Sequence, residues 1–264
     1  MNKLNNKVAI VTGAARGMGF GVSKKMAEYG AIVNMISRGD NVMDSAQAIR
    51  DNGYSAEGYK CDVRDHEALE IIVKKIVEKY GRVDILVNVA GIAPLKAFTA
   101  PDIKQNLDDI MGINFGGTWN MCHIVIPYML QNGYGKIVNF SSVTGVMVCD
   151  PEYSSYAISK AAIAGLTKGL AAEYAARNIN VNAILPGTVY TPMMDSIALD
   201  TIPNNPQKVL DDMANAIPMK RLGTIEEAGE VVSFLVSDES SYITGSNILF
   251  DGGSTLPEYS KAGL

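Results

Sequence analysis

A glycine-rich turn placed directly after the first apolar run restricts the fold of this chain more than any other feature. The run Val8–Val11 leads into Thr12-Gly13-Ala14-Ala15-Arg16-Gly17-Met18-Gly19, and a helix-like stretch follows as far as Tyr29. The glycines permit a tight turn, a close approach of the backbone to a pyrophosphate, and close packing of the helix on a sheet. Free N–H groups at a helix start favour phosphate binding. The predicted cofactor contacts in this turn are Gly13, Arg16, Gly17, Met18 and Gly19.

Short apolar runs recur along the chain, with helix-like stretches between them. They show little polar alternation, which is typical of parallel strands covered on both faces, and they are Val8–Val11, Ile32–Ile36, Val83–Val87, Ile137–Phe140, Val181–Leu185 and Ile248–Phe250. One intervening stretch starts at an acidic N-cap candidate, Asp65, and ends at a C-cap candidate, Gly81. The alternation predicts an α/β fold, a Rossmann-like doubly wound parallel sheet with helices on both faces. Ligands are expected beyond the carboxyl ends of its strands.

The length and composition favour one domain over residues 1–264. Folds of the α/β class with 264 residues commonly form one unit, and 47% hydrophobic residues are enough for a large core. The excursion at about 191–221 breaks the strand–helix rhythm with four prolines and the Asn204-Asn205 turn signal, which predicts short helices. We interpret this excursion as a substrate lid, and an ordered surface loop is the alternative.

Charge argues against two classes of partner. The net charge is −5, and no run of basic residues is longer than the pairs Lys24-Lys25 and Lys74-Lys75, so nucleic acid and anionic membranes are not expected as partners. The N-terminal residues lack the apolar stretch of a signal peptide. The widely spaced Cys61, Cys122 and Cys149 fit reduced thiols and have no metal-site spacing. We therefore expect a cytoplasmic protein without a catalytic metal.

The residues after the second apolar run bear on the choice of dinucleotide. An acidic residue there would accept hydrogen bonds from the ribose of NAD(H), but Ser37 and Arg38 occupy the position. A guanidinium binds a 2′-phosphate in two contacts, and Arg16 adds a second positive charge. NADP(H) is therefore favoured. NAD(H) stays open because Arg38 can instead stack on adenine or face solvent, and because Asp40 is close in sequence.

Asp62 and Val63 follow the expected third strand and are further cofactor candidates. The carboxylate of Asp62 can accept a hydrogen bond from the adenine amino group. The alternative is that Asp62 caps the helix that starts near Asp65.

Tyr156 and Lys160 stand four residues apart in a segment that continues helically to about Arg177, so they share one helix face. A phenol has a pKa near ~10, and a neighbouring ammonium lowers it. Tyr156 can then exchange a proton with a substrate oxygen. Ser142 can donate a hydrogen bond to the same oxygen, with Ser141 as its competitor for this role.

These motifs stand together in the order seen in one enzyme family. Thr12-Gly13-x-x-x-Gly17-x-Gly19, Asn88-Val89-Ala90-Gly91, Asn114, Ser142, Tyr156-x-x-x-Lys160 and Pro186-Gly187-Thr188-Val189-Tyr190-Thr191 resemble the short-chain dehydrogenase/reductase family from about Lys7 to Gly253. The resemblance implies that Tyr156 is the catalytic acid/base, that Lys160 lowers its pKa and holds the nicotinamide ribose, and that Ser142 orients the carbonyl. It also implies that Asn114 kinks a helix and supports a water linked to Lys160.

The same resemblance implies further cofactor residues. Asn88, Ala90 and Gly91 match the motif that stabilises the sheet beside the cofactor, although Val89 replaces the usual second Asn. The residues that match the segment seating the nicotinamide are Pro186, Gly187, Val189 and Thr191.

Five methionines fall near the expected cleft, and flexible thioethers adapt to bulky apolar ligands; they are Met147, Met193, Met194, Met213 and Met219. A hydrophobic ketone or secondary alcohol is the expected substrate. The segments Thr191–Met194, Ala216–Met219 and Asp251–Glu258 are similar to a bacterial subgroup of uncertain substrate, some of whose relatives act on hydroxysteroids. Basic residues in the excursion keep a 3-oxoacyl thioester on an acyl carrier open; they are Lys208, Lys220 and Arg221.

The small residues of the Tyr153–Arg177 helix, together with the family resemblance, imply a homotetramer. The motifs argue against two other classes of function. A non-catalytic dinucleotide-binding regulator would tolerate loss of the tetrad Asn114, Ser142, Tyr156 and Lys160, all of which is present. A sugar-nucleotide epimerase or dehydratase would need a differently spaced glycine turn.

Overall fold

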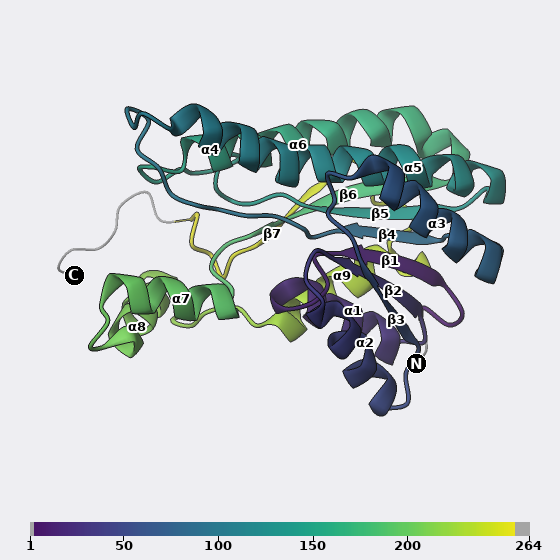
Figure 1. The fold of residues 1–264 in the computed structure, drawn as a ribbon, viewed down its shortest axis with the longest axis horizontal. Coiled ribbons are helices and arrows are strands. Elements are labelled where there is room, and N and C mark those ends of the chain that lie inside the picture. Colours follow the sequence, from purple (N-terminus) through teal and green to yellow (C-terminus); the bar gives the residue numbers. More distant parts are fainter. Residues whose placement is uncertain (1–2, 257–264) are drawn as a thin grey trace.

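The computed structural model describes residues 3–256, apart from the side chains of Met193, Ser196 and Asp200, and builds this part of the chain around one parallel sheet (Figure 1). Pro257 and Glu258, which contributed to the subgroup resemblance, lie outside the described residues. The strands are β1 Val8–Thr12, β2 Ile32–Ser37, β3 Ala56–Lys60, β4 Ile85–Asn88, β5 Gly135–Phe140, β6 Ile179–Pro186 and β7 Asn247–Phe250. Their order is β3-β2-β1-β4-β5-β6-β7. The predicted doubly wound fold is confirmed.

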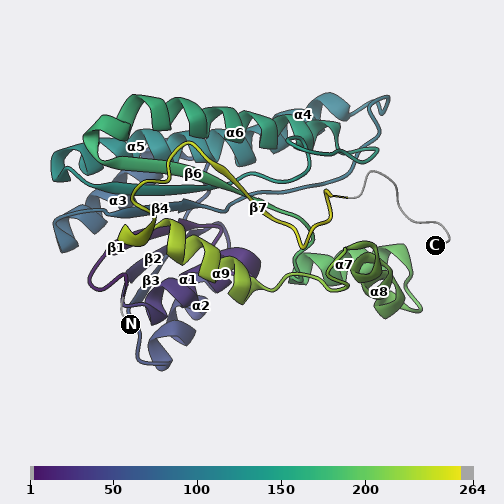
Figure 2. The same cartoon turned by 180° about the vertical axis from the view of Figure 1, so that it is seen from behind.

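Two layers of helices cover the sheet, and the two opposite views agree on their arrangement (Figures 1 and 2). One layer holds α1 Gly17–Glu28, α2 Asn41–Asp51 and α9 Ile225–Leu235. The other holds α3 His66–Tyr80, α4 Ile103–Ile110, α5 Gly117–Asn132 and α6 Ser154–Tyr174. A π-helical segment, Met111–Gly116, joins α4 to α5, and single 3-10 turns follow α6 and α9 at Ala175–Arg177 and Asp238–Ser240. Within residues 3–256, no helix combines the length and the apolar character needed to cross a bilayer.

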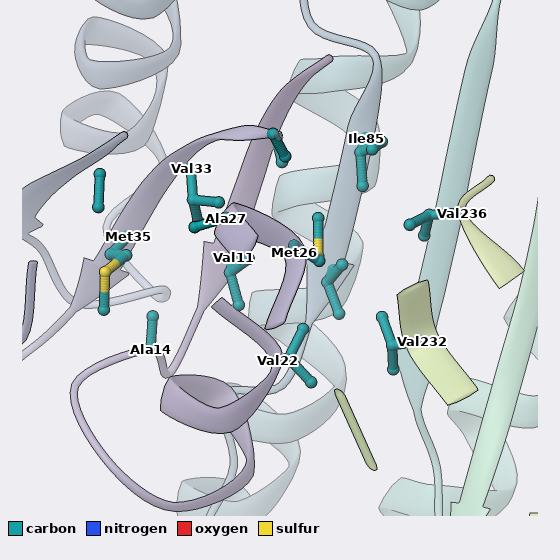
Figure 3. Close-up of a cluster of buried hydrophobic side chains, with 14 of the residues drawn as sticks. Val11, Ala14, Val22, Met26, Ala27, Val33, Met35, Ile85, Val232 and Val236 are labelled. Carbon is teal, nitrogen blue, oxygen red and sulfur yellow. The ribbon is translucent and has the colours of Figure 1, made fainter. Parts of the chain in front are cut away.

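Alternate side chains of each strand enter different cores, as the pleat of a strand requires. On β1, Ala9 and Val11 belong to the core beneath α1, α2 and α9, whereas Val8 and Ile10 belong to the core beneath α3, α5 and α6. Figure 3 shows the first core, in which Val11 packs with side chains from α1. Because both faces are covered, the strands read as unbroken apolar runs in the sequence.

The edge strand β3 contains no apolar run. It pairs only with β2, and its residues Ala-Glu-Gly-Tyr-Lys alternate between buried and partly exposed positions. An edge strand with one solvated side does not need a continuous apolar sequence. The helix predicted after it was placed well: Asp65 accepts a hydrogen bond from the backbone N–H of Ala68 at 3.0 Å, and Gly81 ends α3 with a φ of 77°.

The order of the strands reverses at β1, which pairs with β2 on one side and β4 on the other. Thr12, the last residue of β1, is in register with Ile36 and with Asn88. Loops leaving neighbouring strands in opposite directions open a crevice at such a point. The predicted excursion holds two short helices, α7 Pro192–Thr201 and α8 Pro206–Ala216, which pack on each other and stand apart from both helical layers (Figures 1 and 2).

Candidate active site

A cleft of about 520 Å³ lies at the carboxyl ends of the strands. It brings together most residues that the sequence assigned to a site. Those that line it are Gly13, Arg16, Gly17, Met18, Gly19, Ser37, Arg38, Asp62, Val63, Ala90, Gly91, Ser142, Tyr156, Lys160, Pro186, Gly187 and Thr191. Three predicted residues lie outside its wall: Asn88, Asn114 and Val189.

The glycine turn forms one end of the cleft and fits a pyrophosphate. Gly13 has a φ of 64°, and a Cβ there would lie 2.8 Å from the Cα of Ala90. A Cβ on Gly19 would collide with the carbonyl oxygen of Gly13. The Thr12 hydroxyl accepts hydrogen bonds from the N–H groups of Val89 and Ala90, at 3.1 and 3.2 Å, and so ties the end of β1 to the loop after β4. The backbone therefore carries no side chains at Gly13 and Gly19, where phosphates would approach the start of α1.

Basic side chains mark the part of the cleft next to β2. Arg16 and Arg38 are exposed and line it, together with Ser37. Asp40, which kept the choice of dinucleotide open, is 85% exposed, pairs with Lys60 at 2.8 Å and does not line the cleft. The wall also contains Asn41 and Cys61. Sequence reasoning missed both as site residues, because neither belongs to a motif.

Asp62 lines the cleft as the sequence suggested, and it is not the helix cap. Arg64 holds its carboxylate in two contacts, at 3.1 Å through Nε and 2.7 Å through a terminal nitrogen. Hydrogen bonding from Arg64 lowers the pKa of Asp62. The N-cap of α3 is Asp65, so Asp62 keeps a negative charge at the cleft wall.

Tyr156 and Lys160 project from the first turns of α6 into the cleft. The Nζ of Lys160 lies 5.4 Å from the centre of the Tyr156 ring and donates a hydrogen bond to the carbonyl of Phe140 at 2.7 Å. Ser142 is hydrogen-bonded to Tyr156. The competing Ser141 donates to the backbone carbonyl of Lys160 at 2.7 Å. The contacts thus favour Ser142 over Ser141 as the group beside the phenol.

Burial governs the protonation of this pair. It raises the pKa of Tyr156 to about 12, although the hydrogen bond with Ser142 acts in the opposite direction, and it lowers the pKa of Lys160 to about 8. The expectation that the ammonium brings the pKa of the phenol below its ordinary value is wrong for this geometry, because desolvation of the phenolate outweighs the other contributions. Tyr156 is consequently a neutral phenol at neutral pH, suited to donating a proton to a carbonyl oxygen.

Asn114 lies behind the cleft wall, in the π-helical segment that interrupts the helical path from α4 to α5. Its Oδ1 accepts from the N–H of Ile92 at 2.8 Å, and its Nδ2 donates to the carbonyl of Ile92 at 3.0 Å. A Cβ on Gly91 would lie 3.2 Å from this Oδ1 and 3.6 Å from the Nζ of Lys160. Asn114 therefore acts on the cleft through Ile92, which lines it.

Asn88 and Val189, two further residues expected beside the cofactor, do not line the cleft, and their role toward a cofactor stays a prediction. Asn88 points into the protein, where its Nδ2 donates to the Oδ1 of Asn139 at 2.9 Å, so it braces β4 against β5. Val189 is buried and forms an isolated bridge with Gly223. Motif position alone does not say which face of the segment a side chain takes.

Four of the five methionines predicted around the cleft do not form its wall. Met147 and Met219 are 54% and 58% exposed, Met194 and Met213 are partly buried, and none of the four lines the cleft. The side chain of Met193 lies outside the described residues. Across residues 3–256, no three His, Cys, Asp or Glu side chains gather as metal ligands would.

Comparisons with known proteins agree with this geometry. The chain matches the family model described as Enoyl-(Acyl carrier protein) reductase over residues 13–255. It is 45% identical to Oxidoreductase UcpA of Salmonella typhimurium, with both chains covered completely. It is 38% identical to the 3-oxoacyl-(acyl-carrier-protein) reductase FabG of Thermotoga maritima, with 96% of this chain and 100% of that protein covered.

Solved structures show the same arrangement. The aldohexose dehydrogenase of Thermoplasma acidophilum superposes with a TM-score of 0.90 at 29% identity, covering 100% of this chain and 99% of that one. Levodione reductase superposes with a TM-score of 0.89 at 30% identity, covering 97% and 99%. Enzymes of this kind use nicotinamide cofactors, and the bare glycine turn and the cleft fit such a group. The chain belongs to the short-chain dehydrogenase/reductase family and is an oxidoreductase of that family.

Proposed function

We propose that the protein interconverts a hydrophobic ketone and the corresponding secondary alcohol, with NADP(H) as cofactor and Tyr156 as acid/base. The observation that carries the proposal is the buried, neutral phenol of Tyr156, which is hydrogen-bonded to Ser142 in the cleft that begins at the glycine turn. The same cleft contains the backbone that fits a dinucleotide, so the proton donor and the cofactor would meet there.

The roles of the residues follow from their places. The turn from Gly13 to Gly19 would hold the pyrophosphate, while Pro186, Gly187 and Thr191 would seat the nicotinamide. When bound, this cofactor supplies or accepts a hydride. Ser142 donates a hydrogen bond to the substrate oxygen, and the Oη of Tyr156 gives that oxygen its proton during reduction and takes one back during oxidation. Lys160 lies under the phenol, held by the carbonyl of Phe140.

The choice of NADP(H) over NAD(H) is supported by charge. Arg16 and Arg38 line the cleft, where they could meet the 2′-phosphate of an adenine ribose, and the carboxylate nearest in sequence, Asp40, is engaged by Lys60. A guanidinium forms charge-assisted hydrogen bonds with a 2′-phosphate, whereas the ribose of NAD(H) offers only neutral hydroxyl groups.

A hydrophobic substrate is supported by the surface at the mouth of the cleft. Large apolar side chains are exposed on segments that follow the carboxyl ends of β4, β5, β6 and β7, the edge of the sheet where the cleft lies: Leu95, Phe98, Met147, Val148, Tyr190, Leu199, Met219 and Leu256. A patch of exposed apolar side chains marks a binding surface more often than apolar side chains scattered singly over a protein do. The proposal includes a substrate lid formed by residues 191–221. A hydroxysteroid is one candidate substrate.

A 3-oxoacyl thioester is the second candidate, supported by the similarity to a reductase of that name. The basic side chains that could meet an acidic carrier are engaged within the chain. Lys208 pairs with Asp212 at 3.7 Å, Arg221 pairs with Glu227 at 2.6 Å, and Lys220 donates to the carbonyl of Asn215 at 2.6 Å. This engagement favours a free small molecule.

Substrate turnover separates these candidates. Oxidation of NADPH and, separately, of NADH is followed with hydrophobic ketones, diketones, keto-steroids and acetoacetyl thioesters. Turnover of a ketone or keto-steroid with NADPH is the expected result. Turnover of the thioester alone would show that the substrate is a 3-oxoacyl thioester and not a free ketone. Turnover with NADH alone would contradict the role of Arg38.

We also propose a homotetramer, and a cytoplasmic location remains a prediction. Exposed apolar residues on two separate faces support the assembly: Trp119 and Ile158 on α5 and α6, and Phe234 and Leu249 on α9 and β7. A closed assembly with two kinds of two-fold interface needs two such faces. Light scattering of the purified protein tests it, with four times the monomer mass as the expected value.

A further inference from the structure

Ser159 connects the turn that carries Tyr156 to Asn114. It precedes Lys160 in α6 and is completely buried. Its Oγ donates a hydrogen bond to the backbone carbonyl of Tyr156 at 2.7 Å and accepts one from the Nδ2 of Asn114 at 3.0 Å. One hydroxyl thus contacts the backbone of the acid/base and the side chain of a second tetrad residue.

The other contacts of Asn114 extend this connection to the cleft wall. The amide of Asn114 holds the N–H and the carbonyl of Ile92, and Ile92 lines the cleft. The chain of contacts therefore runs from Tyr156 through Ser159 and Asn114 to Ile92. Tyr156 and Ser159 belong to α6, Asn114 to the π-helical segment and Ile92 to the loop after β4, so the contacts join three segments of the chain.

A second serine makes the equivalent contact at the next turn of α6. Ser141, at the end of β5, donates to the carbonyl of Lys160 at 2.7 Å. The backbone carbonyls of Tyr156 and Lys160 are both held by serine hydroxyls, one reaching toward Asn114 and the other fixed to β5. The two turns that present the reacting groups are thereby anchored on two sides.

We propose that Ser159 is a positioning residue for the reaction, holding Tyr156 and Asn114 in register through its buried hydroxyl. The inference rests on the proposed function. The hydroxyl of a serine in a helix often donates a hydrogen bond to a backbone carbonyl of the preceding turn. Such a contact alone would not connect α6 to another segment. Here the same oxygen is also an acceptor for Asn114. Removing it leaves a buried amide hydrogen of Asn114 without this partner, which is unfavourable.

The first test is Ser159→Ala, a change that removes the hydroxyl and favours the helix. We expect kcat to fall about tenfold, as loss of one well-placed hydrogen bond implies, while the Kd for NADPH stays close to that of the wild type and the Tm falls by only a few degrees. Ser155→Ala is the matched control, because Ser155 is also buried in the first turn of α6 but has no side-chain hydrogen bond within residues 3–256. Equal kcat values in Ser159→Ala and the wild type would overturn the proposal.

A double-mutant cycle separates positioning from general packing. If Ser159 acts through Asn114, the effects of Ser159→Ala and Asn114→Ala on kcat are less than multiplicative in the double variant. Fully multiplicative effects would contradict the connection. Should Ser159→Ala not fold, the pair Ser159→Thr and Ser159→Val replaces it, since the two differ mainly in the hydroxyl. The threonine variant is expected to be faster, and equal rates would overturn the proposal.

The outcome for Ser159 can be told apart from that for the proposed function. If the wild type turns over no carbonyl compound, the proposed function fails, and amide hydrogen exchange then tests the contacts of Ser159. Faster exchange at Ile92 and in residues 111–116 of Ser159→Ala than of Ser155→Ala supports the connection. Equal exchange in the two variants contradicts it.

Discussion

The hydroxyl of Ser142 is hydrogen-bonded to the phenol of Tyr156, whose pKa burial raises to about 12. The two residues come from different parts of the chain, one following β5 and the other in the first turn of α6. At neutral pH the phenol keeps its proton. It can pass this proton to a substrate oxygen that either displaces Ser142 from the phenol or contacts Ser142 and Tyr156 together. Under the proposed function, Ser142 and Tyr156 would both donate to the carbonyl oxygen and so polarise it.

Burial of Lys160 predicts how stability depends on pH. In the folded protein the pKa of Lys160 is about 8, below the ordinary value of 10.5. Between these values the unfolded chain binds a proton that the folded chain does not, so the contribution of Lys160 to the free energy of unfolding rises with pH. We expect Lys160→Met to remove this rise. Urea unfolding at pH 7.5 and 10 measures this rise, and identical pH dependence in the two proteins would contradict the lowered pKa of Lys160.

Arg38 is expected to select the dinucleotide. Arg38→Ala should raise the KM for NADPH by about ten- to a hundredfold, equivalent to the loss of a charge-assisted contact, and change the KM for NADH little. Arg177→Ala is the control, since Arg177 is exposed beyond the end of α6 and does not line the cleft. Steady-state kinetics with both cofactors checks the prediction. A parallel loss with NADPH and NADH would mean that Arg38 contacts a part common to both.

The glycine turn offers a matched pair of substitutions. Gly19→Ala should weaken NADPH binding at least about tenfold and lower stability, because the added Cβ meets the backbone of Gly13. Gly165→Ala, in α6 with nothing within 4 Å of the added Cβ in one protomer, should leave NADPH binding unchanged. Fluorescence titration and thermal unfolding measure both variants. Unchanged binding in Gly19→Ala would show that the turn is not packed as described.

The sequence predicted the central sheet and the glycine turn because both depend on local pattern. Buried parallel strands require apolar runs, and a turn that approaches a phosphate requires glycine, so these features can be read from short segments. The edge strand β3 lacked such a run, since only one of its sides is paired. Local pattern was also sufficient for Asp65 and Gly81, the two ends of α3.

What the sequence could not predict depends on packing between distant segments. Asn88 and Val189 belong to recognisable motifs, yet neither lines the cleft: Asn88 contacts Asn139, and Val189 is buried in a bridge with Gly223. The pKa of Tyr156 is set by how deeply α6 and its neighbours bury the phenol, which spacing along a helix does not reveal. Ser159 is one of several small residues in α6, and only the fold brings it to Asn114, 45 positions away in the sequence.

The most direct test of the account compares Tyr156→Phe with the wild type. Phenylalanine keeps the ring and removes the proton donor, so kcat should fall about a thousandfold, within the range for general acid catalysis. The Kd for NADPH, measured by fluorescence titration of the same samples, should stay within about twofold, since the phenol is not the main contact of the dinucleotide. Loss of turnover with retained NADPH binding is the predicted result. Turnover by Tyr156→Phe at the wild-type rate would contradict the central claim that Tyr156 is the acid/base.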